Sequence, residues 1–578
     1  MSEESSKPTN RSLFDWLGFR RDMDWNVAKP LGRAFGSILA IAIPLLFFGS
    51  IIAAAFVLWG TIRDIGSGAS SGPNLGAGAM IAALLGAPFI IWGTYLRQRA
   101  VEFQKEGLLT DRINKAVEML GADKTWLQYT MDEAGNPVQV ERTVPNIEVR
   151  IGGLLSLERI AQDSVRYDEG RDHVRVMEIL CAYVRENAPA SEARNFPLID
   201  WEPLSDDATQ EQRDSQEKWR LVRFGRPYEC NAEQWALSLP KPRQDISIAL
   251  RVIGRRNNGQ KITETQWTEA IILDEENYKT KPFERPKKIN KRITSRTEII
   301  ELQSKISQWK KSKITSFIFK IDLRNTNLQG ADLSELDFES AIFLMSRLEG
   351  ANLIGTNLKY CMLNFTHLDG ARLQKADLQG ADLFGARLEA ARMEEANLQC
   401  SNLNNAYIDG ADLRSTDLTG ADLAGASLEW SLISKSKLQG ANFRNARMEG
   451  ATLYDSVLDF SNLEETRLRR SSLFKASMKH CYLHNTRIEY SDMKLTDTEG
   501  LSFKGLDLRE VNISQQQLVQ CFGDISVLLP AHLKRPKYWP GWNLPPFVDD
   551  GFKYQWQMWR TDPANYTPPP KPDNNPET

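Results

Sequence analysis

Residues 411–425 read ADLRSTDLTGADLAG, which is three units of five residues. Each unit places a small residue, a polar residue and a leucine before two variable positions. This register continues without a break from Leu323 to Leu508, so a large apolar residue recurs through 38 central positions. Thr498 alone puts a polar residue at a central position. The stretch from Ile321 to Leu508 therefore decides the fold.

A period of five suits neither regular element. On an α-helix each five-residue step turns by about 500°, so the central residues would spread around the axis. On a straight strand an odd step sends every second central residue to the opposite face. All of them face one interior only if the chain turns a corner once per unit. Four such sides close a coil of about 20 residues, and roughly nine stacked coils make a rod about 45 Å long.

The unit resembles the A(D/N)LXX consensus of the pentapeptide-repeat family, as at Ala331-Asp332-Leu333 and Ala351-Asn352-Leu353. The resemblance implies a right-handed quadrilateral β-helix, in agreement with the coil derived above. We expect this β-solenoid to occupy residues 321–513. Because every central residue is then core, Leu398→Lys is expected to disrupt the rod, whereas Gln399→Lys is expected to be nearly silent.

The composition of the 578-residue chain excludes some classes of protein. A net charge of −3 and a charged fraction of 25% give no overall signature of nucleic-acid binding. The six cysteines have no CxxC spacing and so no metal-site pattern. In the predicted rod Cys361 and Cys481 lie six coils apart, about 29 Å, which is beyond disulfide reach. Reduced, buried thiols in the cytosol are the simplest interpretation.

Two uncharged runs lie near the N-terminus. Residues 34–60 and 75–96 contain no charged residue, and each run is long enough to span a bilayer. Basic residues lie before the first run and after the second, so the positive-inside rule predicts a membrane hairpin, 34–96, with both ends in the cytoplasm. A cleaved signal peptide ending near Ala53 is the alternative for the first run. The predicted location is the bacterial inner membrane.

Small residues recur on one face of the second run, at Gly78, Ala82 and Gly86. This face lets another helix approach closely, and the sequence leaves open whether that helix is the first span or a second copy in a homo-oligomer. Neither span carries an ionisable residue, which argues against a proton relay or a substrate path. The preceding segment, 1–33, fits either an amphipathic interfacial helix or a loosely ordered lead-in.

Residues 97–256 are predicted to form a mainly helical cytoplasmic domain with one β-hairpin. Helices are expected from Thr110 or Asp111 to Gly121, at 147–163 and at 171–187. The hairpin is expected around the turn at 132–137. Residues 190–240 read as a long surface excursion. The sequence Arg150-Ile151-Gly152-Gly153 is similar to the helical segment of bacterial membrane-anchored pentapeptide-repeat proteins, and this resemblance implies no catalytic residue.

The remaining segments flank the solenoid. Residues 257–320 are predicted to hold a charged insertion, 257–293, and then a capping helix that could lie over the first coil. The apolar side of this helix carries Ile299, Leu302, Ile306 and Trp309. Residues 514–566 are predicted as a far-end cap, helical from Ser514 to Phe522, with an aromatic tail that packs on the helical domain or on the rod. Residues 567–578 are expected to be a disordered end.

The sequence contains no GxSxG, GxxxxGK[ST] or HExxH motif. Its five histidines are scattered, and surface roles are expected for them. They are His173, His367, His480, His484 and His532. We therefore predict no catalytic, cofactor-binding or metal-binding residue, no cofactor and no enzyme activity.

Charge bears on what the rod binds. Residues 321–510 contain 28 acidic and 21 basic residues, so the rod is only weakly acidic. A local basic patch is expected near its far end, formed by Arg467, Arg469, Arg470, Lys475 and Lys479. Some pentapeptide-repeat proteins mimic duplex DNA and bind type II topoisomerases, which requires a strongly acidic rod, and nucleic acid itself is a disfavoured partner.

The predicted architecture is multidomain: two transmembrane helices, the mainly α-helical domain and the quadrilateral β-helix. We predict a non-enzymatic, membrane-anchored scaffold that presents the rigid solenoid to an unidentified protein partner. The alternatives are a DNA-mimicking topoisomerase-binding protein, an oligomeric channel formed by the membrane hairpins, and an enzyme of unknown type.

Overall fold

The computed structural model describes residues 107–131, 137–167, 170–195, 232–264, 295–315, 319–545 and 551–571, together with isolated residues before 107 and between 196 and 231. The chain divides into two compact units, Met1–Asp111 and Arg112–Thr578. The predicted spans at 34–60 and 75–96 belong to the first unit. The second lies wholly outside the described residues, and of the first only nine residues between Phe48 and Gly60 are described, all of them helical. Among the residues that are described, no helix is both long enough and apolar enough to cross a bilayer.

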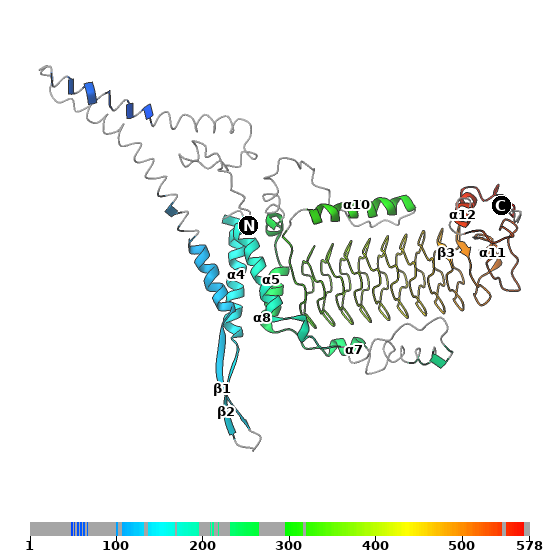
Figure 1. Ribbon diagram of the computed structural model, residues 1–578, viewed down its shortest axis with the longest axis horizontal. Helices are drawn as coiled ribbons and strands as arrows, with labels where there is room; N and C mark the ends of the chain where they lie inside the picture. The colour runs from blue at the N-terminus through cyan, green and yellow to red at the C-terminus, as the bar shows by residue number, and fades with distance from the viewer. Residues whose placement is uncertain are drawn as a thin grey trace, which may run out of the picture. The chain divides into compact units, whose positions relative to one another are not determined.

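The solenoid predicted from the period of five is confirmed. Residues directly before the central positions pair in parallel with residues 20 positions later, from Asp322↔Ile342 to Asp492↔Asn512. Figure 1 shows the resulting stack of coils. The central residues from Leu323 to Leu508, with Thr498 among them, are all at most 1% exposed. Four short sides of five residues therefore enclose one continuous apolar core, and stability comes from contacts between neighbouring coils.

Each corner of the coil is a tight turn. The N–H of the small residue that opens a unit donates to the carbonyl of the preceding central residue, as from Ala331 to Leu328 at 3.1 Å. The second residue after every central position, from Asn325 to Gly505, has a positive φ. A turn of this type requires that conformation at its second middle residue, and glycine adopts it without strain. Non-glycine residues hold it here at φ of 52–64° because the ladders on both sides fix the backbone.

The helices predicted at 147–163 and 171–187 and the predicted hairpin are present in the structure. Helix α4 (Ile147–Tyr167), helix α5 (Arg171–Asn187) and helix α8 (Gln244–Gly254) pack together through apolar faces. Strands β1 (Asp123–Met131) and β2 (Pro137–Pro145) form the predicted antiparallel hairpin, in the register Trp126↔Arg142. Residues 258–264, which the sequence assigned to the charged insertion, are helical and place Glu264 2.8 Å from the ring of His173. This domain is the head of the rod.

The head covers the first coil. The carbonyl of Ala188 accepts from Asn327 at 2.7 Å, and the carbonyl of Gly254 accepts from Asp337 at 2.9 Å. The loop after α5 pairs with the same coil, since the N–H of Ala190 donates to Asn325 at 2.8 Å. These bonds occupy backbone groups that would otherwise form an open strand edge. The ends of α5 and α8 therefore do the capping that the sequence assigned to the helix beginning at Ser295.

That helix, α10 (Arg296–Thr315), instead runs along the side of the rod (Figure 1). It lies on the α10 corner, which comprises the turn residues 359–360, 379–380 and so on to 479–480. Its buried residues Ile299, Leu302 and Ile306 cluster with Tyr360, Cys400 and Phe460. The amide of Gln303 donates to the carbonyl of Gly420 at 3.0 Å. The side chain of Trp309 lies outside the described residues.

The far end is closed by the C-terminal segment. Helix α11 (Gln515–Leu518) begins in a capping box at Ser514 and is shorter than the predicted 514–522, because Phe522–Gly523 becomes strand β5 and pairs with β4 (Ser502–Lys504). Helix α12 (Phe552–Thr561) packs its aromatic residues on this end, and the indole of Trp556 donates to Gly500. The order of the tail continues past the predicted limit at 566, since Trp542 donates to the carbonyl of Pro569.

A buried carboxylate ties α5 to α8. Asp245 accepts hydrogen bonds from the hydroxyl of Tyr183 at 2.5 Å and from the guanidinium of Arg243 at 2.8 and 3.0 Å. Burial alone would raise the pKa of Asp245, but these hydrogen bonds outweigh burial and hold the pKa below its ordinary value. The carboxylate therefore contributes stability above its unfolded pKa of about 4 and loses that contribution as the pH falls through the lower folded value.

Three lysine substitutions test the solenoid. Leu398→Lys should destabilise the rod by more than about 4 kcal/mol, because it buries an unpaired charge. Contrary to the expectation from sequence, Gln399→Lys should cost about 1–3 kcal/mol, since Gln399 is buried at the α10 corner and bonds Asp417 and Gln379. Ser415→Lys is the silent control, because Lys375 and Lys435 already occupy equivalent turn positions. Equal thermal unfolding of all three variants would refute the assignment.

The Asp245 network predicts a pH-dependent loss. Asp245→Asn should lower the free energy of unfolding by about 2 kcal/mol at pH 7, because hydrogen bonds to a charged acceptor are replaced by neutral ones. The gap to the unmodified chain should narrow as the pH falls below about 4. Denaturant unfolding monitored at several pH values measures it, with Asp163→Asn as a surface control. A gap that stays constant from pH 7 to pH 3 would contradict the network.

Candidate functional site

The rod presents four corners and the sides between them, and the described residues of the chain cover one corner and the head end of a second. Helices α10 and α12 lie on the α10 corner. On the diagonally opposite corner, Arg194 bonds Gln329, and a Cβ on Gly350 would lie 2.2 Å from the carbonyl of Ala236 in helix α7 (Ala232–Leu237). This second corner, with turn residues 349–350, 369–370 and so on, is the head-loop corner. The two remaining corners are the candidate binding surfaces.

Carboxylates line the head-loop corner and are buried. Glu349, Asp369, Glu389, Asp409 and Glu429 stand one coil apart in a column. Arginines of the adjoining side neutralise part of this charge, with Arg347 bonding Glu349 and Arg447 3.5 Å from Glu429. Burial raises the pKa of Glu349 above its ordinary value. The column is therefore an internal ion-pair ladder and not an exposed acidic stripe.

One group in this column has the composition of a metal site. Single ligand atoms of Glu349, His367 and Asp369 lie within 4.8 Å of one another. The guanidinium of Arg347 already bonds the Glu349 carboxylate, and Arg387 lies 3.5 Å from Asp369. Two guanidinium groups beside the same carboxylates oppose a divalent cation. The arrangement fits the charge ladder better than metal ligation.

The first uncovered corner carries an apolar surface near the head. We name it the apolar corner, with turn residues 344–345, 364–365, 384–385 and so on. Met345 and Phe365 in its turns are 51% and 45% exposed, and Met362 on the adjoining side is 37% exposed. The ring of Phe365 packs edge-on against Phe384, with centroids 5.5 Å apart, and Leu344 lies beside them in the turn before. Large apolar side chains gathered on an exposed face are typical of a protein-binding surface.

The second uncovered corner is polar, with turn residues 334–335, 354–355, 374–375 and so on. Lys375 lies 3.9 Å from Glu395, and Arg414 bonds Asp412. The basic patch expected from the sequence does not form one surface, because its members point from different corners. Lys475 lies on the polar corner, Arg469 and Arg470 follow the head-loop column, and Lys479 pairs with Glu499 at the α10 corner.

Three of the five histidines differ from their expected surface roles, whereas His532 is exposed as expected. His173 is fully buried in the head, where it contacts Glu264 and Gln260. His484 is buried in the solenoid, with its ring 3.3 Å from Glu464. His480 stacks near Phe460 under α12, and burial lowers its pKa. Among the described residues these rings complete structural contacts and do not converge on one site.

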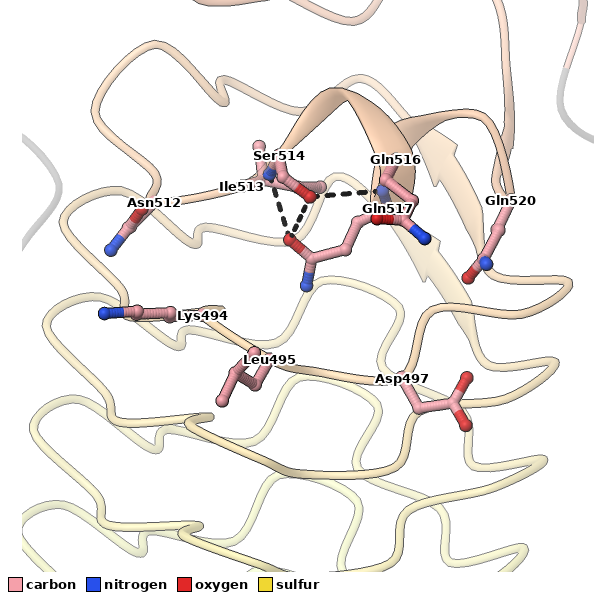
Figure 2. A pocket seen from close by; sticks show the side chains of 9 residues that line it. All are labelled: Lys494, Leu495, Asp497, Asn512, Ile513, Ser514, Gln516, Gln517 and Gln520. Carbon is pink, nitrogen blue, oxygen red and sulfur yellow. Dashed lines mark hydrogen bonds between the residues drawn. The ribbon is translucent and has the colours of Figure 1, made fainter.

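A hollow of about 640 Å³ opens where the last coil meets α11. Figure 2 shows Lys494 and Asn512 on one side of it, and Asp497, Gln516 and Gln520 on the other. Gln517 projects between the two sides and hydrogen bonds to Ser514. The lining of the hollow is mostly polar, and most of its polar side chains are amides. Sequence reasoning missed this hollow because nothing in the repeat pattern marks where the ladder opens.

Comparisons with known proteins concern the solenoid. The family model described as pentapeptide repeats matches in eight copies, over residues 320–353, 351–389, 376–414, 396–434, 411–450 and 451–489. No curated protein sequence matches the chain significantly.

Several solved structures of other proteins are similar to part of this chain. HetL, a pentapeptide repeat protein involved in heterocyst differentiation regulation from the cyanobacterium Nostoc sp. strain PCC 7120, is 22% identical, with 35% of this chain and 85% of HetL covered and a TM-score of 0.23. QnrB1, a plasmid-mediated fluoroquinolone resistance protein, is 20% identical, with 32% and 90% covered and a TM-score of 0.21. A pentapeptide repeat protein from the Arabidopsis thaliana thylakoid lumen is 26% identical, with 18% and 74% covered and a TM-score of 0.14.

Proposed function

We propose, from the premise that this chain is a pentapeptide-repeat protein over residues 320–489, that it is a non-enzymatic docking rod which binds a protein partner along its apolar corner. One observation carries the proposal. The chain covers the α10 corner and the head end of the head-loop corner with its own helices and loops, yet leaves Met345, Met362 and Phe365 exposed on and beside the apolar corner. Exposed apolar side chains on a rigid backbone bind a partner without a large loss of conformational entropy.

The rigidity of the corner supports this role. Met345 and Phe365 sit at turn positions with φ of 56° and 55°, held between ladders on both sides. The flexible side chain of methionine adapts to a partner, and the ring of phenylalanine presents a rigid contact. Both residue types are enriched at protein interfaces. The surrounding Asn and Asp residues of the neighbouring coils form a polar rim. Asn402 bonds Asp382, and Asn442 bonds Asp422, at 2.8 Å each.

The charge of the rod favours protein docking over DNA mimicry. A mimic of duplex DNA needs unpaired negative charges at regular intervals along an exposed surface. Here the carboxylate column is buried and partly paired with arginines, and Asp412 and Asp377 are paired with Arg414 and Lys359. The comparisons indicate no enzyme family either. Both points leave a binding surface as the simplest use of the rod.

We also propose that residues 34–96 tether the rod to a membrane. The support is the sequence: two uncharged runs, 34–60 and 75–96, with basic residues at their outer ends. A tether of this kind would hold the docking corner in the cytoplasm close to the bilayer. Partner binding and membrane attachment are separate properties, and each has its own test.

Glutamates on the apolar corner should abolish docking. The double change Met345→Glu and Phe365→Glu places two charges in the surface, and Glu335, Glu395 and Glu465 already occupy equivalent turn positions with φ of 57–62°. The rod should therefore fold normally, while the amount of partner protein that it captures should fall by at least tenfold. Quantitative mass spectrometry of proteins captured by the immobilised full chain measures the effect.

The matched control is Asn405→Glu with Asn445→Glu. These residues occupy the same column of turns on coils nearer the far end, and they are exposed with positive φ. The control adds the same charge without touching the apolar side chains. Equal capture by the two double variants would refute docking on the apolar corner.

Fractionation tests the tether. The full chain should sediment with membranes and remain there after alkaline carbonate extraction, because two buried apolar spans resist release. A chain that begins at residue 97 should move to the supernatant. If the full chain is also released by carbonate, the two runs do not span the bilayer.

A further inference from the structure

The backbone ladder stops at the hollow beside α11. On lower coils the N–H of the positive-φ residue donates to a carbonyl one coil further on, as from Lys475 to Lys494 at 3.2 Å. The corresponding acceptor for Leu495 would be the carbonyl of Ser514. Ser514 is the N-cap of α11, and its carbonyl accepts from Leu518 at 3.0 Å instead. Within the described part of the chain, the N–H of Leu495 therefore has no acceptor.

The acceptors at this edge are already occupied. The amide of Gln517 donates to the carbonyl of Met493 at 2.8 Å and to that of Thr496 at 2.9 Å. One side chain thus replaces two hydrogen bonds that another coil would supply. At this edge the carbonyl acceptors are therefore bonded, whereas one N–H donor is left without an acceptor beside the hollow.

The side chains around the hollow add further donors. Within the described residues, the Lys494 ammonium and the amides of Gln516 and Gln520 have no side-chain hydrogen-bond partner. The one carboxylate in the lining, Asp497, lies 3.1 Å from the ammonium of Lys479. The exposed Leu495 supplies an apolar wall, and no aromatic ring is among the lining residues. Three free donor groups and a compensated acid favour an anionic ligand.

We propose that this hollow binds the C-terminal carboxylate of an extended peptide from a partner protein. One carboxylate oxygen accepts from the ammonium of Lys494 and the other from the orphaned N–H of Leu495, while the amides of Gln516 and Gln520 across the hollow are left for the peptide groups that precede the chain end. Its volume holds a few peptide residues. Backbone and side-chain donors that converge on a chain end are an established mode of peptide recognition.

The chemistry separates this ligand from others. A sugar would gain from an aromatic wall, which the described lining lacks. A phosphate carries more charge than one free ammonium balances, with Asp497 close by. A carboxylate matches the donor set in charge and in number of acceptor sites. Leu495 beside the ammonium suits the apolar side chain that precedes a chain end.

Calorimetric titration of the purified full chain tests the proposal with four probes. The first is an N-acetylated tetra-alanine peptide with a free C-terminal carboxylate. The others are its C-terminal amide, an amidated peptide with one internal aspartate, and inorganic phosphate. The free carboxylate should bind at least tenfold more tightly than the amide, because charge-assisted hydrogen bonds are lost in the amide. The aspartate peptide and phosphate should bind more weakly than the chain end.

Lys494→Met should lower the affinity for the free-carboxylate peptide by at least fivefold without altering the thermal unfolding of the chain. Lys435→Met is the matched control, because Lys435 is an exposed lysine of the same polar corner three coils below. The site would be overturned if the amide peptide or phosphate bound as tightly as the free-carboxylate peptide. An unchanged affinity of Lys494→Met for the free-carboxylate peptide would also overturn it. Equally tight binding of the aspartate peptide would overturn its assignment to a chain end. The inference stands apart from the apolar corner, since Lys494→Met leaves Met345 and Phe365 intact.

Discussion

The hydrogen-bond ladder between successive coils is the constraint on which the rest of the structure depends. Along the rod the N–H groups of the central and positive-φ residues donate to carbonyls 19 residues further on, as from Leu398 to Asp417 and from Cys400 to Thr419. The residue before each central position donates 21 residues back, as from Asn397 to Ala376. That geometry holds only if each coil has the same length and each corner turns with the same handedness. The buried central residues and the positive φ that follows them enforce both conditions. The head, α11 and the flanking helices are arrangements for stopping this ladder or covering it.

The two ends stop the ladder in different ways. At the head, helix ends supply carbonyls from Ala188 and Gly254, so the first coil meets main chain. At the far end a glutamine side chain, Gln517, takes over the carbonyls of Met493 and Thr496. Main-chain capping satisfies the edge residue by residue, whereas a side chain satisfies only the acceptors that it reaches. The far end consequently retains a donor-rich recess.

The sequence predicted the parts of the fold that repeat or that follow local rules. The central positions, the coil of 20 residues, the hairpin and helices α4 and α5 all follow from periodicity and turn residues. The position of α10 does not follow from these rules, because it depends on which column of turns has side chains small enough for a helix to approach. Gly380, Gly420 and Gly440 make that column narrow, but they align only after the chain is wound. The burial of Gln399 was missed for the same reason.

The candidate surfaces divide in the same manner. Leu344 and Met345 are consecutive apolar residues at variable positions, and with Phe365 one coil later they could have marked the apolar corner in advance. The hollow could not have been found this way, since it arises from a competition between Ser514 as a helix cap and as a rung of the ladder. The roles of His173 and Glu264 depend on contacts between segments 91 residues apart, which no local pattern reveals.

Helix α10 reaches side chains from Tyr360 to Phe460, which belong to different coils. A stack in which each layer touches only its neighbours can fray from either end and melt piecemeal. A helix fastened along the outside joins layers that otherwise share no contact. The middle of the rod should consequently melt as a single cooperative block and resist unzipping, so that amide exchange there requires opening of several layers together.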